Sequence, residues 1–227
     1  MVALKKVSFS YTHKRFAPVC VFENVDAVFE KGKLYVLYGP SGAGKSTLLS
    51  LLGGLSFPQS GEIWIDDVSL TKGNGEDCRR NKVSYIFQDY SLFPYMNAVE
   101  NVEMAIWNNK MSGKEKKDLA TQYLQELGIQ EEEMRRSIRH LSGGQQQRIG
   151  IARALATGAD YLLADEPTGN LDAENADIVT GIFKKLAHEK NKCVIVASHS
   201  RELRAQADVV LYVGDHTLTL EKEGQIP

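Results

Sequence analysis

The sequence predicts an α/β fold in which a mostly parallel, doubly wound sheet carries a phosphate-binding loop. Short apolar runs suited to buried strands alternate with segments whose apolar residues recur at helical spacing. The run GPSGAGKST (39–47) lies between one such strand and one such helix. A charged, helical segment from about 97 to 139 interrupts this alternation. We therefore expect a strand–helix–strand core with an inserted helical lobe.

The individual elements follow from β-branched content, apolar periodicity and turn residues. Predicted strands lie at 2–10, 19–29, 34–39, 61–67, 83–87, 161–165, 193–198 and 208–213. Predicted helices lie at 48–55, 97–107, 114–128, 142–157, 174–189 and 201–207. The polar stretch TKGNGEDCRRN (71–81) is predicted to be a loop, and little structure is expected after Asp215.

Composition limits the class of protein. The 227 residues are 43% hydrophobic and 25% charged, which is typical of a globular chain that forms one large domain. The 27 basic and 29 acidic residues give a net charge of −2, which argues against a general nucleic-acid or polybasic membrane binder. The three cysteines are scattered, which argues against a disulfide scaffold or zinc site and suits a reducing cytosol. The sequence shows neither a signal peptide nor an apolar run of the ~18–20 residues that span a bilayer, so a membrane role would need a partner chain.

The first motif with chemical content is the phosphate-binding loop. Its spacing matches G-x-x-x-x-G-K-[ST] between a strand and a helix. Its glycines let backbone N–H groups surround phosphate oxygens, and the helix start adds partial positive charge. Lys45 can reach the outer phosphates of ATP, and the Ser46 hydroxyl can ligate Mg²⁺. The predicted nucleotide contacts are Gly39, Pro40, Ser41, Gly42, Ala43, Gly44, Lys45, Ser46 and Thr47. The alternative is a glycine-rich turn.

A pair of carboxylates ends a later apolar strand, YLLADEPTG (161–169). Ligands of parallel sheets bind at the carboxyl ends of the strands, beside the phosphate loop. Asp165 is therefore expected next to the Mg²⁺ held by Ser46. Glu166 is expected to orient or deprotonate the attacking water. Considered alone, such a pair is often only a solvated turn.

The run LSGGQQQR (141–148) lies between these two motifs, and the chain thereby resembles the ATP-binding cassette (ABC) ATPases over its whole length. The resemblance implies one domain, 1–227. It consists of a RecA-like core with a small antiparallel β lobe, about 1–88 and 158–227, and a helical lobe, about 89–157. It also implies ATP and Mg²⁺ as cofactors and hydrolysis of ATP to ADP and phosphate. As a bare string, LSGGQ could be a helix cap.

The same resemblance assigns four further residues. Tyr11 would stack on adenine, and Gln88 would contact Mg²⁺ and the attacking water. His199 would contact the γ-phosphate, and Asp172 lies in the loop that faces the opposite subunit. Each residue type taken alone is more often structural.

By this resemblance, two cassettes pair head to tail and close on ATP. Each nucleotide would lie between the phosphate loop of one copy and the signature residues of the other, which are Ser142, Gly143, Gly144 and Gln145. The helix start at Ser142 suits such an anion contact. A homodimer is favoured over a heterodimer.

The segment GNLD (169–172) resembles the group that serves lipoprotein release, macrolide or peptide efflux and cell division. This implies a separate membrane permease and a position on the cytoplasmic face of the membrane. Apolar residues at 91–102 would form its docking groove or, alternatively, the core of the helical lobe.

Other functions stay open on the sequence. One is a non-transport ABC ATPase coupled to a membrane signalling or division complex. A soluble cassette acting on nucleic acid or ribosomes usually has tandem cassettes or a long coiled-coil insertion, and this sequence shows neither. Its charge balance also gives no obvious basic face. A P-loop kinase would leave LSGGQ and His199 without a role.

Overall fold

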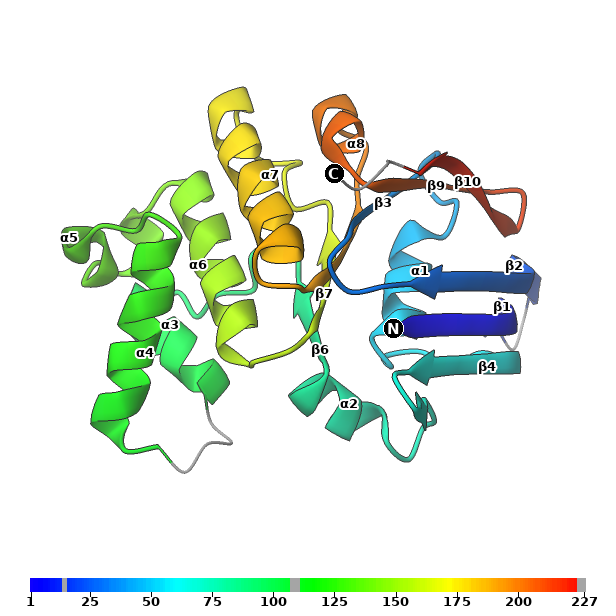
Figure 1. Ribbon diagram of the computed structural model, residues 1–227, viewed down its shortest axis with the longest axis horizontal. Coiled ribbons are helices and arrows are strands. Elements are labelled where there is room, and N and C mark those ends of the chain that lie inside the picture. The colour runs from blue at the N-terminus through cyan, green and yellow to red at the C-terminus, as the bar shows by residue number, and fades with distance from the viewer. Residues whose placement is uncertain (14–15, 107–110, 224–227) are drawn as a thin grey trace.

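The computed structural model describes residues 1–13, 16–106 and 111–223. These residues form two sheets and a group of helices (Figure 1). The strands are β1 (Val2–His13), β2 (Phe16–Phe29), β3 (Leu34–Tyr38), β4 (Ser60–Ile65), β5 (Val68–Ser69), β6 (Val83–Ile86), β7 (Tyr161–Asp165), β8 (Cys193–Ala197), β9 (Val209–Gly214) and β10 (Thr217–Glu223). The helices are α1 (Lys45–Leu52), α2 (Gly75–Asn81), α3 (Ala98–Glu103), α4 (Gly113–Glu126), α5 (Glu131–Met134), α6 (Gly143–Ala156), α7 (Ala173–His188) and α8 (Arg201–Gln206). Short 3₁₀ turns follow α3 at Met104–Ile106 and precede α6 at Ile138–His140.

The larger sheet has the strand order β10-β9-β3-β8-β7-β6. Strands β9, β3, β8, β7 and β6 pair in parallel, and β10 pairs antiparallel with β9. The smaller sheet is antiparallel, in the order β2-β1-β4-β5. The predicted α/β class, with its parallel core and antiparallel β lobe, is confirmed.

Two apolar cores lie on opposite faces of the larger sheet, because successive strand side chains point to opposite sides. Leu37 and Ile195 face the smaller sheet and α1. Val36 and Val196 face the other way, in one cluster with Phe183 of α7. That second cluster continues without a break into α3, α4 and α6. Helix α6 therefore joins the sheet to the group of helices drawn in green in Figure 1.

One predicted loop is wrong. Residues 75–81 of the stretch TKGNGEDCRRN form helix α2. The helix has little apolar periodicity, but Arg80 pairs with Glu76 one turn earlier. Gly75 lets the helix start against Phe57, whose Cζ would lie 2.8 Å from a Cβ at that position.

Strand β10 was also missed, because its residues come after the expected end of the core. Of the predicted helix at 97–107, residues 98–103 are helical and 104–106 form a 3₁₀ turn. Its last residue, 107, lies outside the described residues, as do 108–110 of the helical segment.

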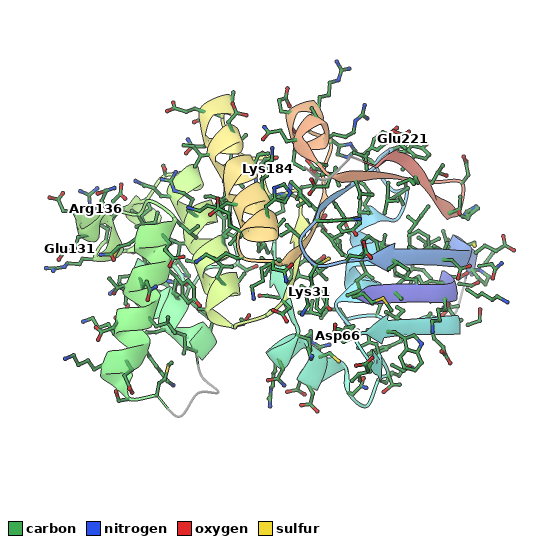
Figure 2. The ribbon with its side chains drawn as sticks, viewed as in Figure 1. Lys31, Asp66, Glu131, Arg136, Lys184 and Glu221 are labelled. Atoms are coloured by element: carbon green, nitrogen blue, oxygen red, sulfur yellow. The ribbon has the colours of Figure 1, made fainter. Side chains whose placement is uncertain are left out.

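A polar cluster closes the edge of the larger sheet at which its parallel strands begin. Asp66 accepts hydrogen bonds from the Tyr161 hydroxyl, from Lys82 Nζ at 3.0 Å and from the Met1 ammonium at 2.9 Å. Burial opposes ionisation, but these bonds outweigh it and hold the pKa of Asp66 well below its usual range. Figure 2 shows Asp66 near α2, far from Glu131 and Arg136 at the left end of the view. The cluster ties the β4–β5 turn to β7.

Candidate functional site

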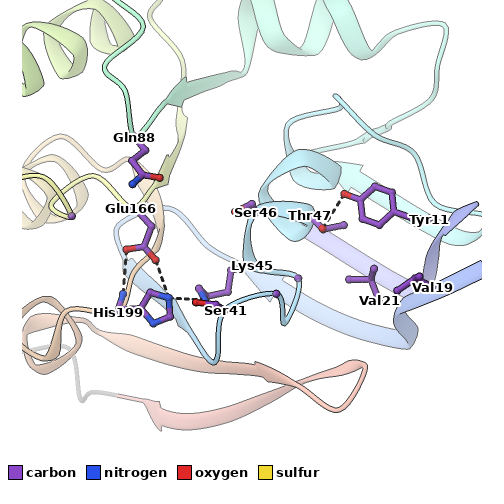
Figure 3. Close-up of a pocket in the computed structure, with 13 residues that line it drawn as sticks. Tyr11, Val19, Val21, Ser41, Lys45, Ser46, Thr47, Gln88, Glu166 and His199 are labelled. Carbon is purple, nitrogen blue, oxygen red and sulfur yellow. Dashed lines mark hydrogen bonds and ion pairs between the residues drawn. The ribbon is translucent and has the colours of Figure 1, made fainter.

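A cavity of about 710 Å³ opens where β3 and β7 end and α1 begins. Most of the phosphate-loop residues line it, and residues from distant parts of the chain complete it (Figure 3). The lining residues are Tyr11, Val19, Val21, Ser41, Gly42, Gly44, Lys45, Ser46, Thr47, Gln88, Glu166, Gly169 and His199. The structure thus brings together residues that the sequence predicts for one site.

The loop between β3 and α1 has a backbone that tolerates few side chains. Gly39 has φ 155°, and a Cβ there would lie 2.1 Å from the Val213 carbonyl oxygen. Gly44 has φ 107°, and its Cβ would lie 2.5 Å from Val21 Cγ1. Ala43 N donates to the Pro40 carbonyl at 3.2 Å and tightens the turn. Glycine is therefore required by position at both ends of the loop.

Lys45 projects from the first turn of α1 and is only 7% exposed. Its Nζ donates to the carbonyl oxygens of Gly39, at 2.9 Å, and Pro40, at 3.2 Å. Burial lowers the pKa of the Lys45 ammonium, and the carboxylates of Glu166 and Asp165 partly offset that effect. A buried cation whose hydrogen bonds go to neutral groups is well placed to bind an anion.

The carboxyl end of β7 supplies the acidic side of the cavity. Glu166 has φ 44°, an unfavourable value for a residue with a side chain, and its N–H donates to the Ala197 carbonyl at 2.9 Å. Its carboxylate accepts from the His199 backbone N–H at 3.3 Å. Asp165 does not line the cavity, although it acts electrostatically on Lys45. Figure 3 shows Glu166 between Gln88 and His199.

The opposite end of the cavity is aromatic and apolar. Tyr11 of β1 is 52% exposed, and its hydroxyl lies 3.1 Å from Thr47 Oγ1. Val19 and Val21, on one face of β2, complete this wall. Sequence reasoning missed these two valines, and it missed Gly169 as a lining residue. The alternation VCVF was the only signal for the valines.

The signature residues are not part of this cavity. Ser142 caps α6, accepting from Gln145 N at 3.2 Å, while Gln145 Oε1 accepts from Ser142 N at 2.7 Å. Gly144 packs so closely on α7 that a Cβ would lie 2.1 Å from Asn175 Oδ1. Asp172 caps α7 through Asn175 N. The chain therefore carries the phosphate loop and the α6 tip at separate places.

The segment at 91–102 was expected to form either a permease-docking groove or the core of the helical lobe, and its residues are partly buried and partly exposed. Ala98, Val99 and Val102 belong to the buried core, and Leu92 packs against it. Phe93 is 46% and Tyr95 83% exposed. Phe87, the neighbour of Gln88 in the chain, is 39% exposed and stacks on Tyr85, while the Arg139 guanidinium lies over the Tyr95 ring. Within the described ranges, no helix is both long and apolar enough to cross a lipid bilayer.

Comparison with known proteins gives consistent matches over the whole chain. The model of the ABC transporter family matches residues 22–169. An uncharacterized ABC transporter ATP-binding protein, YclH of Bacillus subtilis, is 36% identical over 98% of this chain and 97% of its own length. The lipoprotein-releasing system ATP-binding protein LolD 1 of Chlorobium chlorochromatii is 38% identical over 89% of this chain and 84% of its own length.

A solved structure matches with a TM-score of 0.90 and 33% identity over the full length of both chains. It is the dimeric post-hydrolysis state, bound to ADP and Pi, of the ATP-binding cassette MJ0796 of Methanocaldococcus jannaschii.

Proposed function

The chain belongs to the ABC transporter family as an ATP-binding, ATP-hydrolysing subunit, and from this premise we propose which of its residues bind and hydrolyse the nucleotide. The family, the ATPase activity and the transport role predicted from the sequence are confirmed, and the non-transport alternative is not supported. The observation that carries the residue roles is the buried Lys45 ammonium at the base of a cavity lined by the phosphate loop.

ATP binds with its phosphates along residues 39–47 and its base at the aromatic end. The backbone N–H groups of the loop and the start of α1 stabilise the phosphate charge. On binding, Lys45 exchanges bonds to backbone carbonyls for bonds to phosphate oxygens, which are stronger because both partners are charged. The Tyr11 ring packs against adenine, beside Val19 and Val21.

The acidic side of the cavity has the chemistry of a magnesium site. The Ser46 hydroxyl and the Gln88 amide oxygen line the cavity, and the Asp165 carboxylate does not line it but acts electrostatically on Lys45; these are the hard oxygen donors that Mg²⁺ prefers. When bound, Mg²⁺ supplies charge neutralisation between the outer phosphates. Glu166 orients the attacking water and accepts its proton, while His199 donates a hydrogen bond to the γ-phosphate. Gln88 lies on the other side of Glu166 from His199 (Figure 3), and it holds the water from that side.

The site is completed by a second copy of the chain. The capped start of α6 at Ser142 presents backbone N–H groups, yet it does not reach its own cavity. A head-to-tail pair places this tip, with Gly143, Gly144 and Gln145, on the γ-phosphate of the partner's nucleotide. One chain carries both halves of the site, so a homodimer is sufficient. ATP then stabilises the pair, and hydrolysis releases it.

The pair acts on a separate membrane permease from the cytoplasmic face of the membrane. Phe87, Phe93 and Tyr95 are exposed aromatic side chains within eight residues of Gln88 in the chain, so a permease helix that docks on them is coupled to the nucleotide site. We assign the helical lobe to about 89–157 and the core with its β lobe to about 1–88 and 158–227. The GNLD segment and the similarity to a lipoprotein-releasing ATP-binding protein favour a lipoprotein-release or efflux type of permease.

The concentration dependence of the ATPase activity tests this proposal. A site shared between two copies requires that phosphate release per chain rises with protein concentration and then reaches a plateau. Glu166→Gln at the same concentrations is the inactive control. The concentrations should span a ~100-fold range and extend below the one at which the dimer dissociates. A rate per chain that stays constant over this range would contradict the shared site.

A further inference from the structure

Gln147 of α6 carries a buried amide without a hydrogen-bond partner. Its side chain is 0% exposed, and neither Oε1 nor Nε2 has a partner among the described residues. The adjacent Arg148 has an unpartnered buried Nε. Burial of an amide without compensating bonds is unfavourable, so buried amides are nearly always paired. The amide of Gln147 therefore needs an explanation.

The side of α6 that carries Gln147 faces the segment that follows Gln88. Positions 143, 147 and 150 share this side of the helix. A Cβ on Gly143 would lie 3.1 Å from the Tyr90 hydroxyl, and one on Gly150 would lie 3.6 Å from the Tyr90 carbonyl oxygen. Tyr90 thus extends along α6 past the turn that contains Gln147.

The same segment is held to α6 by a charged group. The Arg153 guanidinium donates to the carbonyl oxygens of Ser91 and, at 3.1 Å, of Tyr90. Tyr90 and Ser91 have φ values of 62° and 45°, which are unfavourable for residues with a side chain. Contacts with α6 therefore hold the unfavourable backbone conformation of Tyr90 and Ser91, two residues after Gln88.

We propose that Gln147 is a positioning residue for ATP hydrolysis, which binds the backbone of residues 88–91 when nucleotide is present and thereby fixes Gln88 at the site. This inference rests on the proposed function. A primary amide offers one acceptor and two donors, which match the C=O and N–H groups of a peptide segment. An arrangement in which the Gln147 amide pairs with this segment is stabilised relative to one in which the buried amide stays unpaired. The amide thus favours the catalytic position of Gln88.

Steady-state kinetics of the full chain with MgATP separate positioning from packing. Gln147→Met keeps the side-chain length and removes both hydrogen-bonding groups. We expect kcat to fall ~10-fold or more with KM within ~2-fold of the parent, while the thermal midpoint does not fall. Gln147→Asn, which retains an amide, should recover part of the lost kcat. Ile149→Val, a buried change on the same helix, should alter only the thermal midpoint.

Hydrogen exchange is measured on the chain that carries Glu166→Gln, so that ATP is bound but not hydrolysed. ATP should slow amide exchange at 88–92, and Gln147→Met should abolish that slowing while ATP still binds. Parent-like kcat in Gln147→Met, or equal protection of 88–92 with and without ATP in the Glu166→Gln chain, would overturn the proposal and leave buried water as the partner of the amide. Failure of the proposed function is distinguishable, because the unmodified chain would then fail to hydrolyse ATP.

Discussion

Lys45 Nζ lies 3.2 Å from His199 Nε2, and the same ring nitrogen lies 3.4 Å from Glu166 Oε1. Nε2 can accept from the Lys45 ammonium only without a proton, and it can donate to Glu166 only with one. The ring nitrogen therefore serves one of these partners at a time. A phosphate that takes over Lys45 leaves His199 free to donate. Under the proposed roles, nucleotide binding at Lys45 and the arrangement of Glu166 and His199 are coupled through this one atom.

Lys45→Ala should abolish measurable ATP binding at millimolar nucleotide. The change removes the buried cation of the cavity, and the loop N–H groups alone do not balance the phosphate charge. Calorimetry measures the affinity, with the exposed Lys184→Ala as the matched control. Unchanged affinity in Lys45→Ala would remove this residue from the site.

Glu166→Gln should retain ATP binding and slow turnover by ~10²-fold or more, because the amide cannot accept the proton of the attacking water. The substitution keeps the size of the side chain and its contact with His199 N–H. Single-turnover phosphate release measures the chemical step. Hydrolysis at the parent rate would show that another group acts as base.

Asp66→Asn should lower the free energy of unfolding by about 1–3 kcal/mol at neutral pH, because it weakens three hydrogen bonds to a carboxylate. The folded-state pKa of Asp66 is lowered, so its contribution is present above the unfolded pKa of about 4 and is lost as the pH falls through the folded value. Urea unfolding should show a smaller difference at about pH 3 than at about pH 7. The exposed neighbour Asp67→Asn is the control, and a pH-independent difference would contradict the assignment.

Gly181→Ala should raise the free energy of unfolding by about 0.5–1 kcal/mol, because glycine is unfavourable in the interior of a helix. Gly181 lies on the exposed side of α7, and nothing lies within 4 Å of a Cβ built there. ATPase activity should be unchanged. Gly39→Ala should have the opposite effect on stability, since its Cβ meets a backbone carbonyl. Denaturant unfolding measures this free energy. A lower value for Gly181→Ala than for the parent chain would refute the packing described for α7.

The elements that could be predicted from the sequence are those whose pattern of apolar residues also determines which of their residues are buried. The strand ending at Tyr38, the strand ending at Asp165 and the part of α6 from Ile149 onward have apolar patterns that match their burial. Helix α2 escaped prediction because it is polar and depends on the contact of Gly75 with Phe57. Strand β10 escaped because it pairs only at the sheet edge.

The phosphate-loop, Glu166 and His199 positions could be predicted from motifs, since each motif places its residue at the end of a strand. The bonds between these side chains could not be predicted, because Lys45 and His199 are 154 positions apart in the sequence. The His199 ring can also bond to either Lys45 or Glu166. The unpartnered amide of Gln147 was equally hidden, since α6 looks uniformly polar over QQQR. Side-chain pairing depends on packing that the sequence pattern does not specify.

Complementation between two defective chains tests the shared site most directly. Lys45→Ala and Ser142→Arg, each combined with Glu166→Gln to block hydrolysis, are labelled with different fluorophores and mixed with saturating MgATP. Neither chain should pair with itself. A pair of Lys45→Ala chains lacks the phosphate-loop lysine in both sites, and a pair of Ser142→Arg chains lacks the intact α6 tip in both sites. The mixture should associate on addition of ATP, because one site in the mixed pair has an intact Lys45 and an intact Ser142. Absence of ATP-dependent association in the mixture, or ATP-dependent pairing of either chain alone, would contradict a nucleotide held between two copies.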